Sequence, residues 1–219
     1  MRLFCSCLIW IIASAISTSI HAAYVWMPSP PPEEIEAKLA RVSADPAALK
    51  AAIAAGKRAA FFCVNCHGEV GVSALDHVPN LAGQNAFFLL TQIDKFGDGR
   101  RKDDFMSGLV KVLKPVERFN IAVFYSSQPV PPTPAKDPGL ALAGGRHFRR
   151  ACAGCHGVNA HGTREIARLA GQRGDYLITT LRNYRSGSGL RADARMTGVA
   201  RTLSDAEIDA IASFLGTLP

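Results

Sequence analysis

The chain contains one short motif twice, at residues 63–67 and 152–156, and each copy reads Cys-x-x-Cys-His. This motif is typical of sites where both thiols bond covalently to a haem and the histidine binds its iron. A zinc or dithiol site is the alternative, but a redox pair of cysteines does not require the histidine that follows. We therefore predict two covalently attached haem c groups. The predicted attachment residues are Cys63, Cys66, Cys152 and Cys155, and the predicted proximal iron ligands are His67 and His156.

The chain has four methionines, and two of them follow the motifs at nearly the same distance. Met106 lies 39 residues after His67, and Met196 lies 40 residues after His156. A methionine opposite a histidine closes a six-coordinate iron and raises its reduction potential. The alternative is a core-filling role, which a lone buried methionine usually has. The shared offset favours the ligand role, so Met106 and Met196 are the predicted second axial ligands.

The two motifs belong to a larger internal repeat. When Met106 is aligned with Met196, Met-Ser-Gly-Leu meets Met-Thr-Gly-Val. Upstream, Leu-Ala-Gly-Gln occurs at residues 81–84 and again at residues 169–172, and Gly56 and Gly145 each lie seven residues before a motif. Such self-similarity indicates a tandem duplication. We predict two domains, called here the first half (residues 46–127) and the second half (residues 140–219).

Each half has the hydrophobic spacing of helices. The predicted helices cover residues 46–62, 87–96 and 115–125 in the first half and residues 141–151, 176–184 and 205–215 in the second. Asp45 and Ser204 are predicted N-caps, and Pro46 takes the first helical position. A loop rich in glycine and charge leads into each methionine. The sequence therefore predicts an all-α protein.

Two proline-rich stretches divide the chain. Residues 128–139 contain five prolines, which cannot continue a helix, and form the predicted linker between the halves. A stiff, extended connector of this kind can hold one half against the other. The second stretch, at residues 28–32, precedes a helix predicted over residues 33–42. This helix lies in an extension, residues 23–45, that has no counterpart in the second half.

The N-terminal sequence predicts export. Arg2, an apolar run over residues 3–16 and small residues up to Ala22 have the pattern of a secretory signal peptide over residues 1–22. A retained membrane anchor over residues 3–20 is the alternative, because these 18 residues just reach the length of a spanning helix. Cys5 and Cys7 lie in this segment, so cleavage leaves only the four motif cysteines. We expect the protein in the periplasm.

Positive charge is concentrated in the second half. Residues 23–127 hold 12 Lys and Arg against 11 Asp and Glu, whereas residues 140–219 hold 11 Arg against 6 acids. Such an excess can steer docking to an acidic redox partner or to an anionic membrane surface. Ordinary solvated helix faces are the alternative, and haem propionates would cancel part of the charge. Nucleic acid is not an expected partner of an exported haem protein.

Residues 46–219 resemble the dihaem cytochromes of the c4 type. The resemblance depends on the doubled motif, on residues 79–84, and on the glycine-rich segments 97–100 and 187–189 that precede the two methionines. It implies tandem class I cytochrome c domains, joined by the linker and related by a pseudo-twofold axis, with haem propionates meeting at the interface. It also implies Met/His ligation of both haems, electron donation to a membrane-bound terminal oxidase, and no catalytic residues.

One residue departs from this family pattern. The family's proline, whose carbonyl accepts a hydrogen bond from the proximal histidine, is Pro79 in the first half, but Ala167 stands there in the second. Because a backbone carbonyl remains at Ala167, we expect the hydrogen bond to persist with a looser loop. The two haem potentials therefore need not be equal.

Two other functions remain open at this point. The chain could be the haem subunit of a periplasmic dehydrogenase, such as the partner of a flavin-containing sulfide dehydrogenase, with the extension as its docking element. It could instead be an enzyme, a dihaem peroxidase or a thiosulfate dehydrogenase, which would need an open or unusually ligated iron. His77 and His161 are spare histidines, but both lie in polar stretches and are predicted to face solvent, and Met27 has no predicted role. An electron shuttle is favoured because no paired acid and base suggests substrate chemistry.

Overall fold

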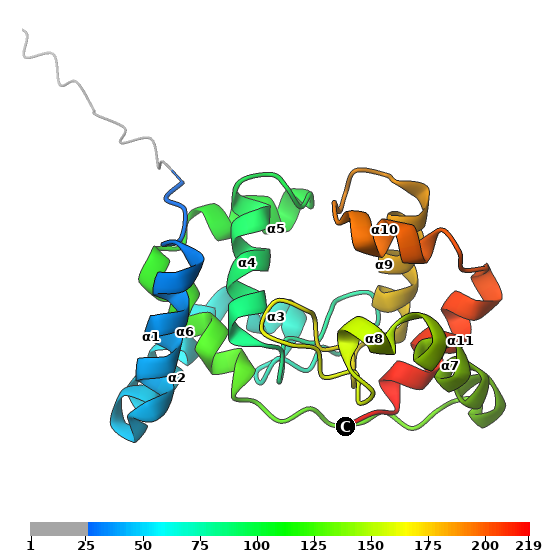
Figure 1. The fold of residues 1–219 in the computed structure, drawn as a ribbon. Helices are drawn as coiled ribbons and strands as arrows, with labels where there is room; N and C mark the ends of the chain where they lie inside the picture. The colour runs from blue at the N-terminus through cyan, green and yellow to red at the C-terminus, as the bar shows by residue number, and fades with distance from the viewer. Residues whose placement is uncertain (1–25) are drawn as a thin grey trace, which may run out of the picture.

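The computed structural model describes residues 26–219, and regular secondary structure within them is helical (Figure 1). Over this range the chain forms no β-strand, and only an isolated bridge joins Arg101 to Arg191. The predicted all-α class is confirmed. The predicted signal peptide (residues 1–22) and the alternative anchor (residues 3–20) lie outside the described residues. None of the described helices is both long enough and apolar enough to cross a membrane.

The two halves repeat one order of helices. The first half contains α2 (Pro46–Ala59), the 3-10 helix η1 (Ala60–Phe62), α3 (Val64–His67), α4 (Ala86–Gly97), α5 (Asp104–Lys111) and α6 (Pro115–Ser126). The second half contains α7 (Pro138–Ala151), α8 (Ala153–His156), α9 (Gly174–Ser186), α10 (Ala194–Ala200) and α11 (Asp205–Gly216). Figure 1 shows the halves side by side, with α2 and α6 at one end of the molecule and α7 and α11 at the other.

Side-chain caps fix where the long helices begin. The Asp45 carboxylate accepts hydrogen bonds from the first backbone amides of α2, and Ser204 forms a capping box with Glu207 at the start of α11, as predicted. Helix α7 starts at Pro138 with Asp137 as its N-cap, three residues earlier than predicted. Pro138 was assigned to the linker, but proline is well suited to the first position of a helix.

In each half the helix before the motif crosses the C-terminal helix at a glycine. A Cβ on Gly56 in α2 would overlap the Asn120 carbonyl oxygen in α6, so only glycine allows this approach. In the second half, a Cβ on Gly144 in α7 would overlap the Ala210 carbonyl oxygen in α11. The sequence match of Gly56 with Gly145 is therefore one residue off, because the close backbone contact is made by Gly144.

The N-terminal extension folds onto the first half. It forms α1 (Pro32–Ala44), longer than the predicted helix over residues 33–42, and buries Ile35 in the first core, which is formed by buried residues of α2, α4 and α6. The Trp26 ring occupies the space that a side chain at Gly97 would fill, and the Arg118 guanidinium lies 4.1 Å from the centre of that ring. The extension is thus part of the fold of the first half.

Arg118 is the buried charge beneath this extension. Its side chain is 0% exposed and forms an ion pair of 2.7 Å with Asp94 in α4. It also donates to the backbone oxygen of Met27, while Ser29 donates to Asp94 at 2.9 Å. A buried charge is stable only when paired and hydrogen-bonded. The extension supplies two of the polar groups that satisfy the Arg118–Asp94 pair.

The halves meet through two equivalent glutamines. The Gln84 amide donates to the Arg168 carbonyl at 2.9 Å and accepts from the Arg168 amide at 2.8 Å. In the same way, Gln172 donates to the Asn80 carbonyl at 3.0 Å and accepts from the Asn80 amide at 2.7 Å. Because Gln84 and Gln172 come from the repeated Leu-Ala-Gly-Gln, this reciprocal pattern shows the predicted pseudo-twofold relation of the domains.

The linker crosses this interface. A side chain at Gly83 or at Gly171 would overlap Val130, so the linker valine lies against both glycines of the repeated segment. Further along, the Thr133 amide donates to the Gly216 carbonyl at 2.8 Å. The connector therefore packs along the contact between the halves.

Candidate functional site

Each Cys-x-x-Cys-His motif forms one short helical turn. The His67 amide donates to the Cys63 carbonyl at 2.9 Å, and the His156 amide donates to the Cys152 carbonyl at 3.0 Å. Both cysteines and the histidine of each motif therefore lie within one helical turn. Burial raises the pKa of the Cys63 and Cys152 thiols to about 11, so both are neutral thiols at pH 7.

Both motif histidines are buried and held by one ring nitrogen. His67 Nδ1 lies 2.8 Å from the Pro79 carbonyl oxygen, and His156 Nδ1 lies 2.9 Å from the Ala167 carbonyl oxygen. A carbonyl only accepts, so Nδ1 carries the proton and Nε2 is left with a lone pair. Burial lowers the pKa of both imidazoles, and these hydrogen bonds raise it. The bond to Ala167 persists as predicted, and a neutral, oriented imidazole is the form that binds a metal.

The two predicted methionine ligands lie at equivalent positions near the start of short helices, α5 and α10. Asp103 caps α5 and accepts from the Met106 amide at 2.9 Å, while Asp193 caps α10 and accepts from the Met196 amide at 3.2 Å. Met196 and Cys152 both pack against the second core, which includes buried residues of α7, α9 and α11. These two helices were not predicted from the sequence, although an aspartate three residues before each methionine is a recognisable N-cap signal.

The spare ligands lie away from the buried site residues. His77 and His161 are both exposed, as predicted, and the Met27 side chain is half-exposed. Within residues 26–219, no three His, Cys, Asp or Glu side chains come together in a way that could hold a metal ion. A zinc site would need such a cluster. The donor set of two thiols and one oriented imidazole in each half fits haem c.

A pair of arginines joins the halves close to both methionine segments. Arg101 and Arg191 lie five residues before Met106 and Met196 and form the isolated bridge, and both guanidinium groups donate to the Tyr176 hydroxyl. Burial raises the pKa of Tyr176, but the two nearby positive charges lower it to about 8. Within the described part of the chain, neither guanidinium forms an ion pair with a carboxylate. This cluster was missed from the sequence, although its equal offset from the methionines was visible there.

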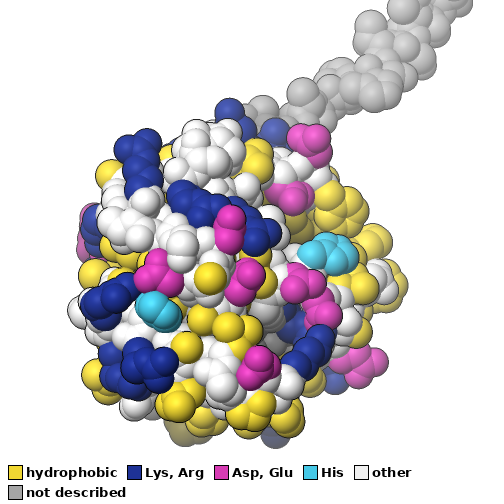
Figure 2. Space-filling view, turned by 90° about the vertical axis from the view of Figure 1, so that its right-hand side faces the viewer, with side chains coloured by type: hydrophobic (Ala, Val, Ile, Leu, Met, Phe, Trp, Pro, Cys, Tyr) yellow, Lys and Arg dark blue, Asp and Glu magenta, His cyan; other side chains and the backbone are white. Residues whose placement is uncertain are grey.

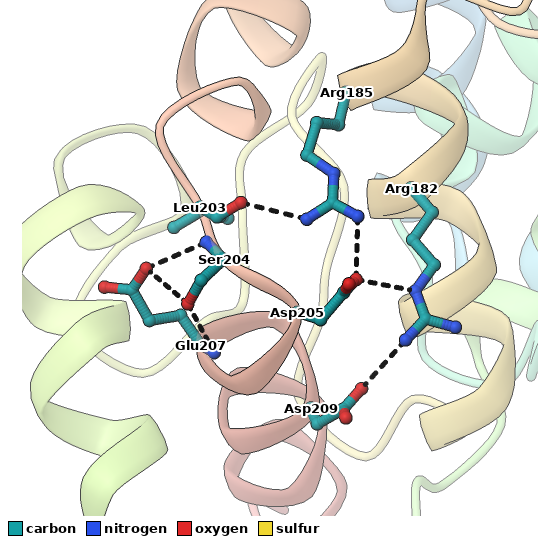
Figure 3. Close-up of polar contacts among 7 residues, drawn as sticks. All are labelled: Arg182, Arg185, Leu203, Ser204, Asp205, Glu207 and Asp209. Atoms are coloured by element: carbon teal, nitrogen blue, oxygen red, sulfur yellow. Dashed lines mark hydrogen bonds and ion pairs between the residues drawn. The ribbon is translucent and has the colours of Figure 1, made fainter.

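Most of the excess charge in the second half is paired. Six of its eleven arginines form ion pairs with carboxylates. Figure 3 shows two of them, Arg182 and Arg185 of α9, against Asp205 and Asp209 of α11. Figure 2 shows positive and negative side chains interspersed on the side of the molecule that the second half forms. This pattern favours ordinary solvated helix faces over a strongly basic docking surface.

Comparisons with known proteins agree with the fold. The family model "Cytochrome c" matches residues 141–219. Cytochrome c4 of Thiocapsa roseopersicina is 35% identical over 167 residues, which cover 70% of this chain and 85% of that protein. A protein named "Thiosulfate dehydrogenase electron acceptor" from Thiomonas intermedia is 32% identical over 190 residues, or 78% of this chain and 85% of that protein. The crystal structure of reduced cytochrome c4 from Pseudomonas stutzeri has a TM-score of 0.71 and 32% identity, covering 75% of this chain and 97% of that one.

The two cytochrome c4 similarities cover 70% and 75% of this chain and 85% and 97% of the respective relatives. They agree with the doubled haem motif, the all-α fold and the pseudo-twofold arrangement. The protein is thus an electron-transfer protein with two covalently bound haem c groups. The chain belongs to the cytochrome c4 family.

Proposed function

We propose that the protein is a periplasmic electron shuttle in which each half holds one haem closed by histidine and methionine. Bound haem c supplies an iron that gains and loses a single electron. The observation that carries the proposal is the matched pair of sites: each has two cysteines, a histidine fixed through Nδ1, and a methionine at the same position of a capped helix. A protein that only passes electrons needs no open coordination position.

The residues of this chain have separate roles in the proposal. Cys63 and Cys66 attach the first haem, and Cys152 and Cys155 attach the second. The Pro79 and Ala167 carbonyls keep Nε2 of His67 and His156 directed at the iron, since they hold the opposite ring nitrogen. Met106 and Met196 supply thioether ligands that raise the potential and exclude exogenous ligands.

Arg101, Arg191 and Tyr176 are the proposed partners of the haem propionates. Two half-buried guanidinium groups that lack a carboxylate partner within residues 26–219 are costly unless anions approach them. Arginine is well suited to bind carboxylates through paired N–H groups. Arg101 and Arg191 come from different halves and form a bridge. Propionates bound to them would therefore lie at the contact between the halves.

A dehydrogenase is the proposed electron donor, and a terminal oxidase is the proposed acceptor. The name of the Thiomonas intermedia relative supports the donor, because it describes that protein as an electron acceptor for thiosulfate dehydrogenase. The role of the extension as a docking element, which the sulfide dehydrogenase alternative invoked, is less well supported because the extension has a structural role in the first half. Ile35 is buried in the first core, and the extension contributes one hydrogen bond each to Arg118 and Asp94.

The first experiment is a redox-titrated optical spectrum of the exported holoprotein, with carbon monoxide added to the reduced form. Two low-spin haems at positive potentials that do not bind carbon monoxide would support the shuttle. A haem that binds carbon monoxide would contradict methionine ligation in that half and favour an enzyme. Mixing the oxidised protein with thiosulfate dehydrogenase and thiosulfate then tests the donor, since reduction faster than by thiosulfate alone is expected.

A further inference from the structure

Tyr125 in α6 has a hydroxyl that is buried without a partner. The residue is 0% exposed, and its hydroxyl forms no hydrogen bond within the described part of the chain. A buried hydroxyl without a hydrogen bond costs about 1–3 kcal/mol, so such groups are rare unless something else binds them. Tyr125 therefore needs an explanation beyond packing.

The second half has no such hydroxyl, because Leu215 takes the same place in α11. The Gly83 amide donates to the Tyr125 carbonyl at 2.9 Å, and the equivalent Gly171 amide donates to the Leu215 carbonyl at 2.9 Å. Leu215 is 1% exposed and lies in the second core. At these matched backbone positions, the first half thus has a buried hydroxyl where the second half has an apolar side chain.

A second difference accompanies the first one. The Tyr125 ring lies over Gly71, where an added Cβ would come within 2.6 Å of the ring atom Cδ1. The equivalent of Gly71 is Ala160: the Gly71 carbonyl accepts from Leu81 and Ala82, and the Ala160 carbonyl accepts from the matching residues 169 and 170. Ala160 is buried and has a φ of 56°, an unusual conformation for alanine. At these two matched positions, the first half has glycine and tyrosine, and the second half has alanine and leucine.

The position of the Tyr125 hydroxyl relates it to the first haem motif. Cys63 packs against the first core, to which Tyr125 belongs. The ring that carries the hydroxyl lies over Gly71, which is four residues after His67 of the motif. Burial raises the pKa of Tyr125, and the Cys63 thiol raises it further. Hydrogen bonds near the sulfurs and ligands of a redox centre tune its potential.

We propose that Tyr125, accommodated by Gly71, is a positioning residue that directs a hydroxyl donor at the Cys63 edge of the first haem and raises the potential of that haem relative to the second. This rests on the proposed attachment of the first haem at Cys63 and Cys66. A proton donor directed at an electron-rich edge stabilises the reduced state more than the oxidised state. The second haem lacks this contribution because Leu215 is apolar.

The deciding experiment compares Tyr125→Phe with the wild-type holoprotein in an NMR-monitored redox titration that follows each haem separately. The expected result is a lower potential for the first haem and an unchanged potential for the second. An unchanged first potential, together with a higher free energy of unfolding, would overturn the proposal. That result would show that the hydroxyl is only an unsatisfied group whose removal is favourable.

A matched pair of exchanges tests the same idea in the other direction. The variant Ala160→Gly/Leu215→Tyr places the tyrosine arrangement in the second half and is expected to raise the second potential alone. If this variant still carries two haems and its second potential does not rise, the proposal is wrong. If it loses a haem, Tyr125→Phe alone decides, because that change removes one atom and keeps the ring. If the first haem is not attached at Cys63 and Cys66, variants that lack these cysteines will still have the mass of a protein with two haems. A failure of the attachment proposal can therefore be distinguished from a failure of the Tyr125 proposal.

Discussion

Helices α6 and α11 occupy equivalent places in the two halves, but they contribute opposite charges to the ion pairs with their neighbouring helices. In the first half, α6 supplies the base Arg118 and α4 supplies the acid Asp94. In the second half, α11 supplies the acids Asp205 and Asp209, and α9 supplies the bases (Figure 3). The Arg118 side chain is 0% exposed, whereas the Asp205 side chain is 64% exposed.

The difference between these ion pairs indicates which parts of the duplicated fold are interchangeable. The haem motifs, the helix caps and the glycine crossing recur in both halves, and they define the frame. The ion pair between the C-terminal helix and its neighbour differs between the halves. Many side-chain pairs can form between two helices that are already packed against each other. Within residues 26–219, the fully buried base of an ion pair is in the first half, where the extension supplies further hydrogen bonds to the pair.

The largest test of the comparison removes one haem. Replacing Cys63 and Cys66 with alanine should abolish attachment in the first half alone, and replacing Cys152 and Cys155 should abolish it in the second half alone, because each thiol pair serves one haem. The intact mass of the exported protein measures the number of haems. Two haems remaining in either variant would contradict the assignment.

Removing one methionine should open one iron. In Met106→Ala and in Met196→Ala both haems stay attached, but the altered half binds carbon monoxide and its potential falls because the thioether ligand is lost. The optical spectrum of the reduced protein with carbon monoxide measures the effect, and Met27→Ala is the control. An unchanged spectrum and potential in either variant would show that the methionine is a core filler.

The buried and exposed ion pairs should differ in their contribution to stability. Arg118→Ala should lower the free energy of unfolding of the first half by about 3 kcal/mol, because it leaves Asp94 without its base in a buried site. Asp205→Ala should change the second half little, since exposed pairs contribute weakly. Denaturant unfolding of the holoprotein compares the two. An equal loss of unfolding free energy in the two variants would mean that the exposure of an ion pair does not determine its contribution to stability.

The interface glutamines should contribute to a similar degree in the two halves. Gln84→Ala and Gln172→Ala each remove two hydrogen bonds to the opposite half, with an expected loss of about 1–2 kcal/mol at the contact. The hydrogen bonds between Gln172 and Asn80 are buried, whereas those between Gln84 and Arg168 are only partly buried, so the loss should be slightly larger for Gln172. Amide hydrogen exchange at Asn80 and Arg168 measures the effect directly, because these amides donate to the glutamines. Unaltered exchange would show that the halves are held together elsewhere.

The smallest expected effect is a pH dependence confined to the second half. Hydrogen bonds from the Ser204 backbone and hydroxyl lower the pKa of Glu207 from its ordinary 4.5 to about 2, with a further contribution from Arg150. A lowered pKa gives stability that is present above pH 4.5 and is lost as the pH falls towards 2. Glu207→Gln should therefore reduce the pH dependence of unfolding over this range. If wild type and variant show the same pH dependence of unfolding, Glu207 is not its cause.

Local signals made much of the fold predictable. The Asp45 cap and the Ser204 capping box are encoded in three or four residues, so the starts of α2 and α11 follow from the sequence. The start of α7 was misplaced because Pro138 satisfies both a linker and a first helical turn. The short helices α5 and α10 were missed because a seven- or eight-residue helix with an internal glycine has little periodicity.

Tertiary contacts explain what the sequence could not show. The repeated Leu-Ala-Gly-Gln was visible, but nothing local indicates that its glutamines bind the opposite half. The motif residues could be proposed from the sequence because covalent attachment of haem c requires a fixed spacing. The Arg101, Arg191 and Tyr176 cluster was not found, because its members come together only when the two halves pack.

The reciprocal glutamine contact has the form of an isologous interface, in which one patch meets its own copy. A single half that carried this patch would be able to pair with an identical molecule. The linker turns that association into an intramolecular one, so it no longer depends on protein concentration. Once the partner is always present, the two copies need not stay identical. Val130, which packs against both equivalent glycines, places the single linker in contact with both copies of the patch.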